Sequence, residues 1–218
     1  MKELFITNIY VLIKNKYLHI LNILLYLFAI SSLIMSDNNM NLWIYYTYVV
    51  THIVFYFGIY MYYMISNRVI SIQIMNYNRI KVFYVVVLEL SIYEMIVIMV
   101  FHFIISLREA RSILYNIIAS SIIYFPLVIV CIIVSLIINN YIISSFTIWF
   151  FLCFTGFVYL FIENNKFIKI LSATYHLQEL SMRRVDYVEL SIYLIMMFLL
   201  ILLLWYVLKR LIDKREYK

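Results

Sequence analysis

Long apolar runs divide this chain, and they restrict its fold more than any other feature. At 1.5 Å per residue, each run can cross the ~30 Å hydrocarbon core of a bilayer as a helix. Inside lipid, a helix satisfies all its backbone polar groups within one segment. The sequence therefore predicts an all-α, polytopic membrane protein with six transmembrane helices. The predicted spans are residues 18–35, 42–65, 82–107, 113–138, 141–162 and 190–208.

The composition leaves no room for a second, soluble domain. Hydrophobic residues make up 67% of the chain and charged residues 13%, far from the balance of a soluble protein. The longest polar segment, residues 163–189, is too short to bury a core of its own. Residues 1–218 are therefore expected to form a single transmembrane domain. Cys131 and Cys153 both lie inside apolar runs, which argues against a disulfide framework or a metal site.

The first 17 residues show a helical pattern with an apolar and a polar face. This pattern predicts an interfacial helix that lies along the membrane surface before the first span. A cleaved signal peptide is the competing interpretation, but no small-residue cleavage site follows the first apolar run. The apolar face consists of Phe5, Ile6, Ile9, Leu12 and Ile13.

Residues 66–81 form the main polar interruption in the first half of the chain. The segment carries Arg68, Arg79 and Lys81 and no acidic residue, so the positive-inside rule places it in the cytoplasm. Val69 and Ile72 recur at helical spacing, which predicts a short amphipathic helix between two spans. An ordinary basic loop is the alternative.

The distribution of lysine and arginine predicts the orientation. With the N-terminus inside, eleven of the 17 basic residues lie on the cytoplasmic side and six on the other. Both termini are therefore expected in the cytoplasm, and residues 163–189 outside as short helices on the outer interface. The net charge of +6 sits at the ends of the runs, so the expected partner is the anionic lipid bilayer, with no nucleic acid. The abundance of Ile, Asn, Tyr, Lys and Phe indicates a low-GC bacterium and hence its cytoplasmic membrane.

Sequence motifs for enzymatic chemistry are missing from the chain. Its two glycines, Gly58 and Gly156, are isolated, whereas a Walker loop needs several near a Gly-Lys-Ser/Thr triplet. The chain also contains no His-Glu-x-x-His zinc-protease motif. It is therefore predicted not to be an enzyme, to bind no cofactor and not to hydrolyse ATP itself.

The second apolar run carries a stripe of polar aromatic side chains on one helical face. The stripe is interpreted either as a face that packs against other helices or as the lining of a path for an amphipathic substrate. Its members are Tyr45, Tyr48, His52, Tyr56, Tyr60 and Tyr63.

The third run contains two acidic residues, Glu89 and Glu94. A charged group at mid-membrane costs about 2.5–3.5 kcal/mol on insertion scales, so each needs a reason to be there. Five positions separate them, so they point in different directions and do not form a paired acid–base site. They either form structural hydrogen bonds to neighbouring spans or carry a proton or cation. Residues 89–93 and 189–193 share the sequence Glu-Leu-Ser-Ile-Tyr, but no second stretch supports an internal repeat.

The order of these parts resembles a type-2 ABC transporter permease. That family has an amphipathic helix before the first span, a coupling helix between spans two and three, and an outer re-entrant segment between spans five and six. The corresponding segments here are residues 1–17, 66–81 and 163–189. Residues 66–81 lack the acidic residue and the glycine often found in that family's coupling helix.

The resemblance implies a permease subunit that pairs with a second permease copy or paralogue and with a separate ABC ATP-binding subunit, which would bind the ATP. Its cargo would be an exported amphipathic or hydrophobic molecule, such as an antimicrobial peptide, a drug or a lipid. Two alternatives stay open. One is a bacteriocin-immunity or assembly protein that transports nothing, and the other is a proton-coupled secondary transporter using Glu89 or Glu94. The residues expected to contact the ATPase are Arg68, Gln73, Asn76, Asn78 and Arg79.

Overall fold

The computed structural model describes residues 2–34, 42–66, 69–107, 113–138, 140–161, 165–181, 184 and 186–214, and within these ranges every regular element is a helix. The predicted all-α class is therefore confirmed. The helices are α1 (Lys2–Lys14), α2 (Lys16–Ile34), α3 (Leu42–Ser66), α4 (Val69–Asn76), α5 (Arg79–Ser106), α6 (Ile113–Ile138), α7 (Tyr141–Phe161), α8 (Lys166–Leu171), α9 (Ala173–Ser181) and α10 (Tyr187–Lys214).

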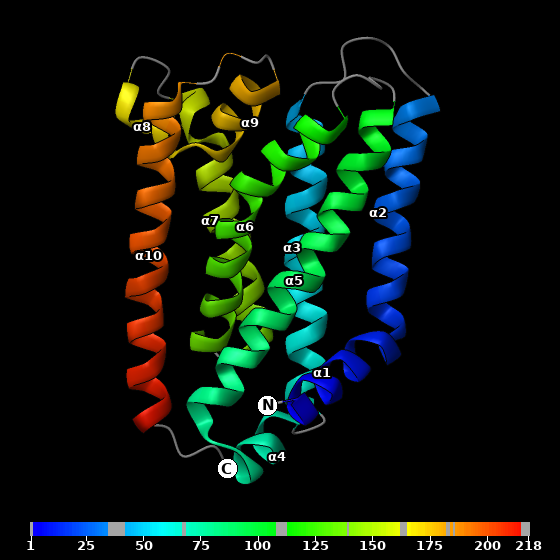
Figure 1. The fold of residues 1–218 in the computed structure, drawn as a ribbon, viewed down its shortest axis with the longest axis vertical. Helices are drawn as coiled ribbons and strands as arrows, with labels where there is room; N and C mark the ends of the chain where they lie inside the picture. The colour runs from blue at the N-terminus through cyan, green and yellow to red at the C-terminus, as the bar shows by residue number, and fades with distance from the viewer. Residues whose placement is uncertain are drawn as a thin grey trace.

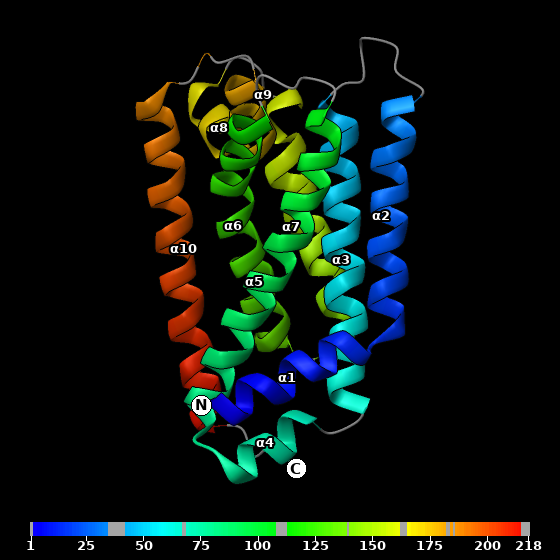
Figure 2. The same cartoon turned by 45° about the vertical axis from the view of Figure 1, so that its right-hand side comes forward.

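Six long helices run side by side along the long axis of the molecule, and the four short ones lie at its two ends (Figures 1 and 2). The long helices, α2, α3, α5, α6, α7 and α10, follow the six predicted apolar runs to within a few residues. Helices α1 and α4 lie at one end, where α10 also finishes, and α8 and α9 lie at the other. We call these the inner and the outer end, after the predicted orientation.

Not every long helix qualifies as a membrane span. Among the described residues, α5, α6 and α10 are long and apolar enough to cross a membrane. A fourth span results if α1 and α2, which meet at a bend of 64°, are taken together. Within α7, residues 141–156 form an apolar but shorter helical stretch, and α3 is rich in tyrosine. The six-span topology with both termini inside stays a prediction.

Asn15 produces the bend between α1 and α2. Its side-chain oxygen accepts hydrogen bonds from the backbone N–H of Tyr17 (3.1 Å) and Leu18 (3.4 Å), which caps the start of α2. The helix α1 then crosses the inner end of the bundle, where it contacts α5.

The orientation of α1 differs in part from the predicted faces. Phe5, Ile6 and Ile13 are exposed, as an interfacial helix requires. Leu12, however, is buried together with the polar Asn8, which is not a member of the predicted apolar face. The reason is that α1 packs across the inner end of the bundle, where the buried Asn8 side chain accepts a hydrogen bond from Gln73 of α4.

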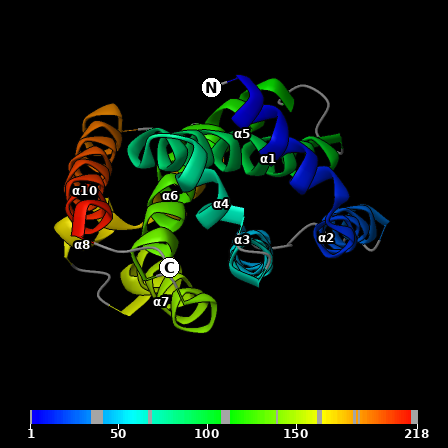
Figure 3. The same cartoon turned by 90° about the horizontal axis from the view of Figure 1, so that it is seen from below.

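The apolar core lies between α3, α5 and α6, whereas α10 stands at the edge of the bundle. Seen from the inner end, α10 and α2 occupy opposite sides of the molecule (Figure 3). Only 11% of the apolar window of α10 is buried, against 61% for α5 and 56% for α6. Large side chains such as Phe198 and Leu203 therefore face outward, where a bilayer or another subunit would cover them.

Candidate functional site

Four polar side chains meet between α2, α3 and α5, about halfway along α3 and α5. His52 of α3 contacts Glu94 of α5 through Nδ1 and Oε1 at 2.9 Å, and its Nε2 lies 2.9 Å from Oδ1 of Asn22 on α2. The Asn22 amide in turn donates to the hydroxyl of Tyr93 at 2.8 Å. His52 and Glu94 are 2% and 0% exposed, so the bundle shields this pair from solvent. We call these four residues the central cluster.

Tyr56, one turn along α3 from His52, completes the surroundings of the central cluster. Its ring stacks on those of His52 and Tyr93, with centroid distances of 6.1 and 5.6 Å. Its hydroxyl and Oε2 of Glu94 are buried and have no hydrogen-bond partner among the residues that the structure describes. Such buried polar atoms cost about 1–3 kcal/mol each unless something satisfies them. The central cluster with Tyr56 therefore has one unused donor or acceptor on α3 and one unused acceptor on α5.

A second buried polar cluster lies closer to the inner end, where four helices contribute one side chain each. The Gln73 amide of α4 donates a short hydrogen bond to Oδ1 of Asn8 on α1. Asn8 also interacts electrostatically with Glu89 of α5, yet neither oxygen of Glu89 has a hydrogen bond within the described part of the chain. Tyr60 of α3 lies within electrostatic range of the same carboxyl. We call Asn8, Tyr60, Gln73 and Glu89 the inner cluster.

Glu89 and Glu94 thus have different neighbours, and the sequence pattern predicted the neighbours of neither residue. The prediction that Glu89 and Glu94 do not form a joint acid–base site agrees with these separate surroundings. The pairing of Glu94 with His52 was missed, although both residues were picked out singly. Both are ionisable side chains about halfway along neighbouring predicted spans, and an ionisable group inside a span usually needs a partner, which is the signal that could have joined them.

The tyrosine stripe of α3 is largely packed against neighbouring helices in this structure. Tyr56 and Tyr60 are fully buried, and Tyr56 stacks on Tyr93 of α5, while Tyr48 is 41% exposed and stacks on Phe28 at a centroid distance of 3.3 Å. Tyr63 is half-buried, and the side chain of Tyr45 lies outside what the structure describes. The stripe therefore serves as a packing face here, and its role as a substrate path stays a prediction.

The structure contains the predicted short helix between α3 and α5, with its faces arranged differently from the prediction. Gln73, expected to contact a partner, points inward onto Asn8 and is only 5% exposed. Ile72 and Met75 are exposed instead, at 55% and 82%. The amide of Gln73 turns inward because α1 offers it a buried hydrogen-bond acceptor.

The other expected contact residues of this segment differ in their roles. Asn78 caps α5, since its side chain accepts from the backbone N–H of Ile80 at 3.0 Å. The exposed side chain of Asn76 donates to the Ile72 carbonyl at 3.1 Å, and Arg79 is exposed at the first turn of α5. Arg68 lies outside the described residues.

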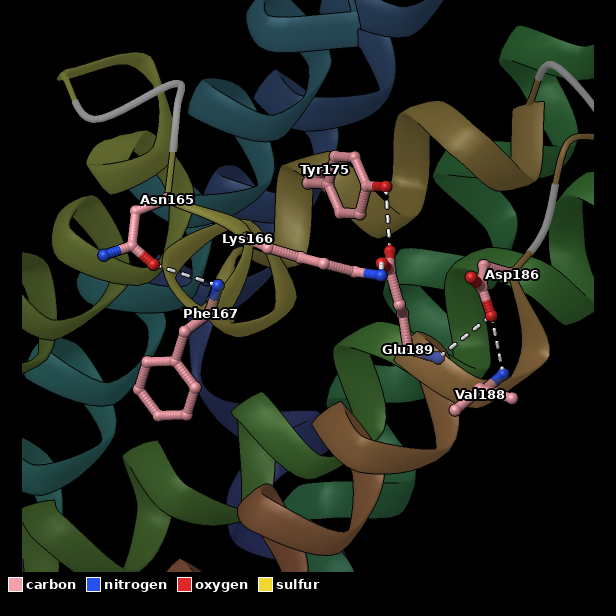
Figure 4. A network of polar contacts seen from close by, with 7 residues as sticks. All are labelled: Asn165, Lys166, Phe167, Tyr175, Asp186, Val188 and Glu189. Carbon is pink, nitrogen blue, oxygen red and sulfur yellow. Dashed lines mark hydrogen bonds and ion pairs between the residues drawn. The ribbon is translucent and has the colours of Figure 1, made fainter.

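A third polar group lies at the outer end, where it ties α8 and α9 to α10 (Figure 4). Glu189, near the start of α10, forms an ion pair of 3.3 Å with Lys166 of α8 and accepts a hydrogen bond of 2.9 Å from the Tyr175 hydroxyl of α9. Partial burial, and after it the bond to Glu189, raises the pKa of Tyr175 to about 12. Asp186 caps α10 by accepting from the backbone N–H groups of Val188 and Glu189.

The hairpin of α8 and α9 is also bound to α7. The hydroxyls of Ser172 and Thr174 both donate to the carbonyl of Gly156. A Cβ at Gly156 would come within 2.2 Å of the Tyr46 ring, so this position requires glycine for close approach. These contacts hold the segment expected at the outer interface against the bundle.

No family model matches the chain, and neither the curated proteins nor the solved structures show a protein similar to it. Groups of three His, Cys, Asp or Glu side chains that could hold a metal ion do not occur in the described ranges. The chain's own geometry is therefore what bears on its function.

Proposed function

We propose that this chain is the membrane-spanning permease subunit of an ABC exporter in a bacterial cytoplasmic membrane. A separately encoded ABC ATP-binding subunit would drive it, and a second permease copy or paralogue would complete the transport path. The cargo would be an amphipathic or hydrophobic molecule such as a peptide, a drug or a lipid.

The observation that carries the proposal is the position and attachment of α4. This helix lies across the inner end between α3 and α5, and it exposes two large apolar side chains, Ile72 and Met75. Such side chains at the end of a bundle, next to polar residues, are typical of a protein–protein contact. The contact surface that we propose consists of Ile72, Met75, Asn76 and Arg79, with Arg68 of the adjoining segment.

The attachments of α4 would carry a displacement into the bundle. On one side, Gln73 is bonded to Asn8, so a movement of α4 would act on α1. On the other side, Asn78 caps α5 directly after α4, so the same movement would act on the start of that long helix. We propose that the tyrosine stripe of α3 then separates from α5 and admits the cargo beside Tyr56, Tyr60, Glu89 and Glu94.

The test is to co-express the chain with an ATP-binding subunit encoded beside it and to purify the pair. The double variant Ile72→Glu/Met75→Glu should lose the subunit and its transport-stimulated ATPase rate, because two carboxylates would have to be buried in the contact. Phe167→Glu, at an equally exposed position of the outer end, is the matched control and should retain the subunit. If the double variant retains the subunit as well as the control does, α4 is not the coupling contact.

A proton-coupled secondary transporter is the second candidate, and the buried His52–Glu94 pair favours it. Such a transporter would accumulate cargo in vesicles that contain this chain alone, in response to an imposed pH gradient. Transport without any ATP-binding subunit would favour this candidate over the exporter.

A further inference from the structure

We propose that the His52–Glu94 pair is an internal proton-binding site, which exchanges its proton with the inner end of the bundle through Tyr56, Tyr60 and Glu89. The inference does not depend on an ATP-binding subunit, because it concerns only groups within this chain.

The hydrogen bonds of Asn22 determine how many protons the pair holds. The Nδ2 group of Asn22 donates to the Tyr93 hydroxyl, so it is Oδ1 of Asn22 that faces Nε2 of His52. An amide oxygen only accepts, which requires Nε2 to carry a proton. The remaining contact, 2.9 Å between Nδ1 of His52 and Oε1 of Glu94, then contains one proton. Whichever of the two atoms carries that proton, the pair as a whole has no net charge.

This neutral state suits the site, since a buried net charge is costly. The groups within electrostatic range of Glu94 are Tyr26 on α2, Tyr56 on α3, Tyr93 on α5 and Cys131 on α6. All four are of types that are neutral near pH 7, so none of them compensates the carboxylate. The proton shared with His52 therefore provides the compensation.

Release of the proton would require Asn22 to turn. Without the shared proton, and with Nε2 still protonated, the Nδ1 lone pair and the Glu94 carboxylate would repel each other at 2.9 Å. If the Asn22 amide turns over, its Nδ2 group donates to Nε2, and the ring proton moves to Nδ1, where it donates to Glu94. The Tyr93 hydroxyl then donates to Oδ1 of Asn22. One proton leaves, and the hydrogen bonds that join α2, α3 and α5 reverse direction.

The route to the inner end follows one face of α3. The buried Tyr56 hydroxyl has no partner in the described ranges, and it lies within electrostatic range of both Glu94 and Tyr60. Tyr60, one turn nearer the inner end, is within range of Glu89. A hydroxyl both donates and accepts, so the two tyrosines can pass a proton between the two carboxyl groups once side-chain movement or water closes the gaps around the unbonded Tyr56 hydroxyl.

Glu89 is the group through which a proton would enter. It is 4% exposed, and neither of its oxygens has a hydrogen bond to a described residue. Its neighbour Asn8 is bonded to Gln73 of α4, next to the exposed surface of that helix. The array therefore runs from the centre of the bundle to the inner end.

The test is infrared difference spectroscopy of the full-length chain in lipid vesicles, between acid and alkaline buffer and after a pH jump. Release of the proton should change imidazole and carboxyl bands together. Both His52→Gln and Glu94→Gln should abolish the whole coupled change. If one variant removes only its own band and leaves the other unaffected, the two residues do not share a proton, and the proposal is wrong.

The route makes a separate, kinetic prediction. Glu89→Gln and Tyr60→Phe should slow the response of the pair to the pH jump at least tenfold and leave its final amplitude unchanged. Glu189→Gln and the exposed Tyr62→Phe are the matched controls and should respond at the wild-type rate. Unchanged rates in both test variants would refute the route through α3.

A further variant covers the case in which Glu94→Gln or His52→Gln fails to fold. Tyr93→Phe removes the acceptor that orients Asn22 and keeps the pair itself. The midpoint of the coupled change should then shift, because the Tyr93 hydroxyl accepts from Asn22 before release and donates to it afterwards, and the loss of these two bonds need not cancel. An unchanged midpoint in a folded Tyr93→Phe variant would contradict the role of Asn22.

Discussion

The pentapeptide Glu-Leu-Ser-Ile-Tyr occurs once in α5 and once in α10, and its two copies have different surroundings. In α5, Glu89 is buried without a hydrogen bond to any described residue, and Tyr93 belongs to the central cluster. In α10, Glu189 has an ion pair with Lys166 and a hydrogen bond from Tyr175. The same five residues thus place one glutamate in a buried site without a hydrogen bond to a described residue and the other in an ion pair.

The positions of the two copies along their helices explain the difference. Glu189 lies in the first turn of α10, where the Lys166 amine is 79% exposed and solvent can stabilise the charge. Glu89 lies several turns inside α5, between buried apolar residues of that helix and Asn8 of α1. A carboxyl group near a helix end has water and mobile cations within reach, whereas one inside a bundle has only what the neighbouring helices provide.

The largest effect is expected where a buried pair is broken. His52→Ala leaves Glu94 buried with no partner, which should lower the free energy of unfolding by about 3–5 kcal/mol. The measurement is thermal or denaturant unfolding in detergent. Replacing both partners, as in His52→Leu/Glu94→Met, should cost less than the single change, and a larger cost would contradict the view that the pair compensates its own charges.

A change of opposite sign is expected at Glu89. Glu89→Leu removes a buried carboxyl group that lacks a hydrogen bond within the described residues, so unfolding should become harder by about 1 kcal/mol. Glu189→Leu, the same substitution in the other copy of the pentapeptide, should instead destabilise the protein. Equal effects of the two substitutions would remove the distinction between the copies.

The hydroxyl of Tyr175 should make stability depend on pH in the alkaline range. Its pKa is about 12 in the folded protein, above the ordinary value of 10.0, so the folded state holds this proton more tightly than the unfolded state does. The contribution is complete below pH 10 and is lost as the pH rises towards 12. Unfolding curves across this window should show the decline in the wild type and a flatter profile in Tyr175→Phe.

The smallest effect is expected at the exposed member of the outer ion pair. Lys166→Ala should lower the free energy of unfolding by about 1 kcal/mol or less, because exposed ion pairs contribute little. Added salt should reduce even that difference. A loss comparable with that of His52→Ala would mean that the outer pair is shielded from solvent in the membrane-bound protein.

The short helix between α3 and α5 shows how far sequence reasoning reached at the proposed contact. Its existence was predictable from the spacing of Val69 and Ile72 within a polar segment. The direction in which its faces point was not, because that depends on Asn8, a residue of another helix that accepts from Gln73. The same limit applied to α1, predicted to be interfacial, where the burial of Leu12 and Asn8 depends on what α5 presents to it.

The sequence by itself determined the all-α class, the six long helices and the short elements between them. These follow from the length of the apolar runs and from the polar residues that interrupt them, which are local properties of the chain. Only the tertiary structure decided that His52 meets Glu94, that Asn22 orients the pair, and that Tyr56 and Tyr60 are enclosed. The physical reason is that helical periodicity determines which residues share a face, whereas the packing of one helix on another determines what that face touches.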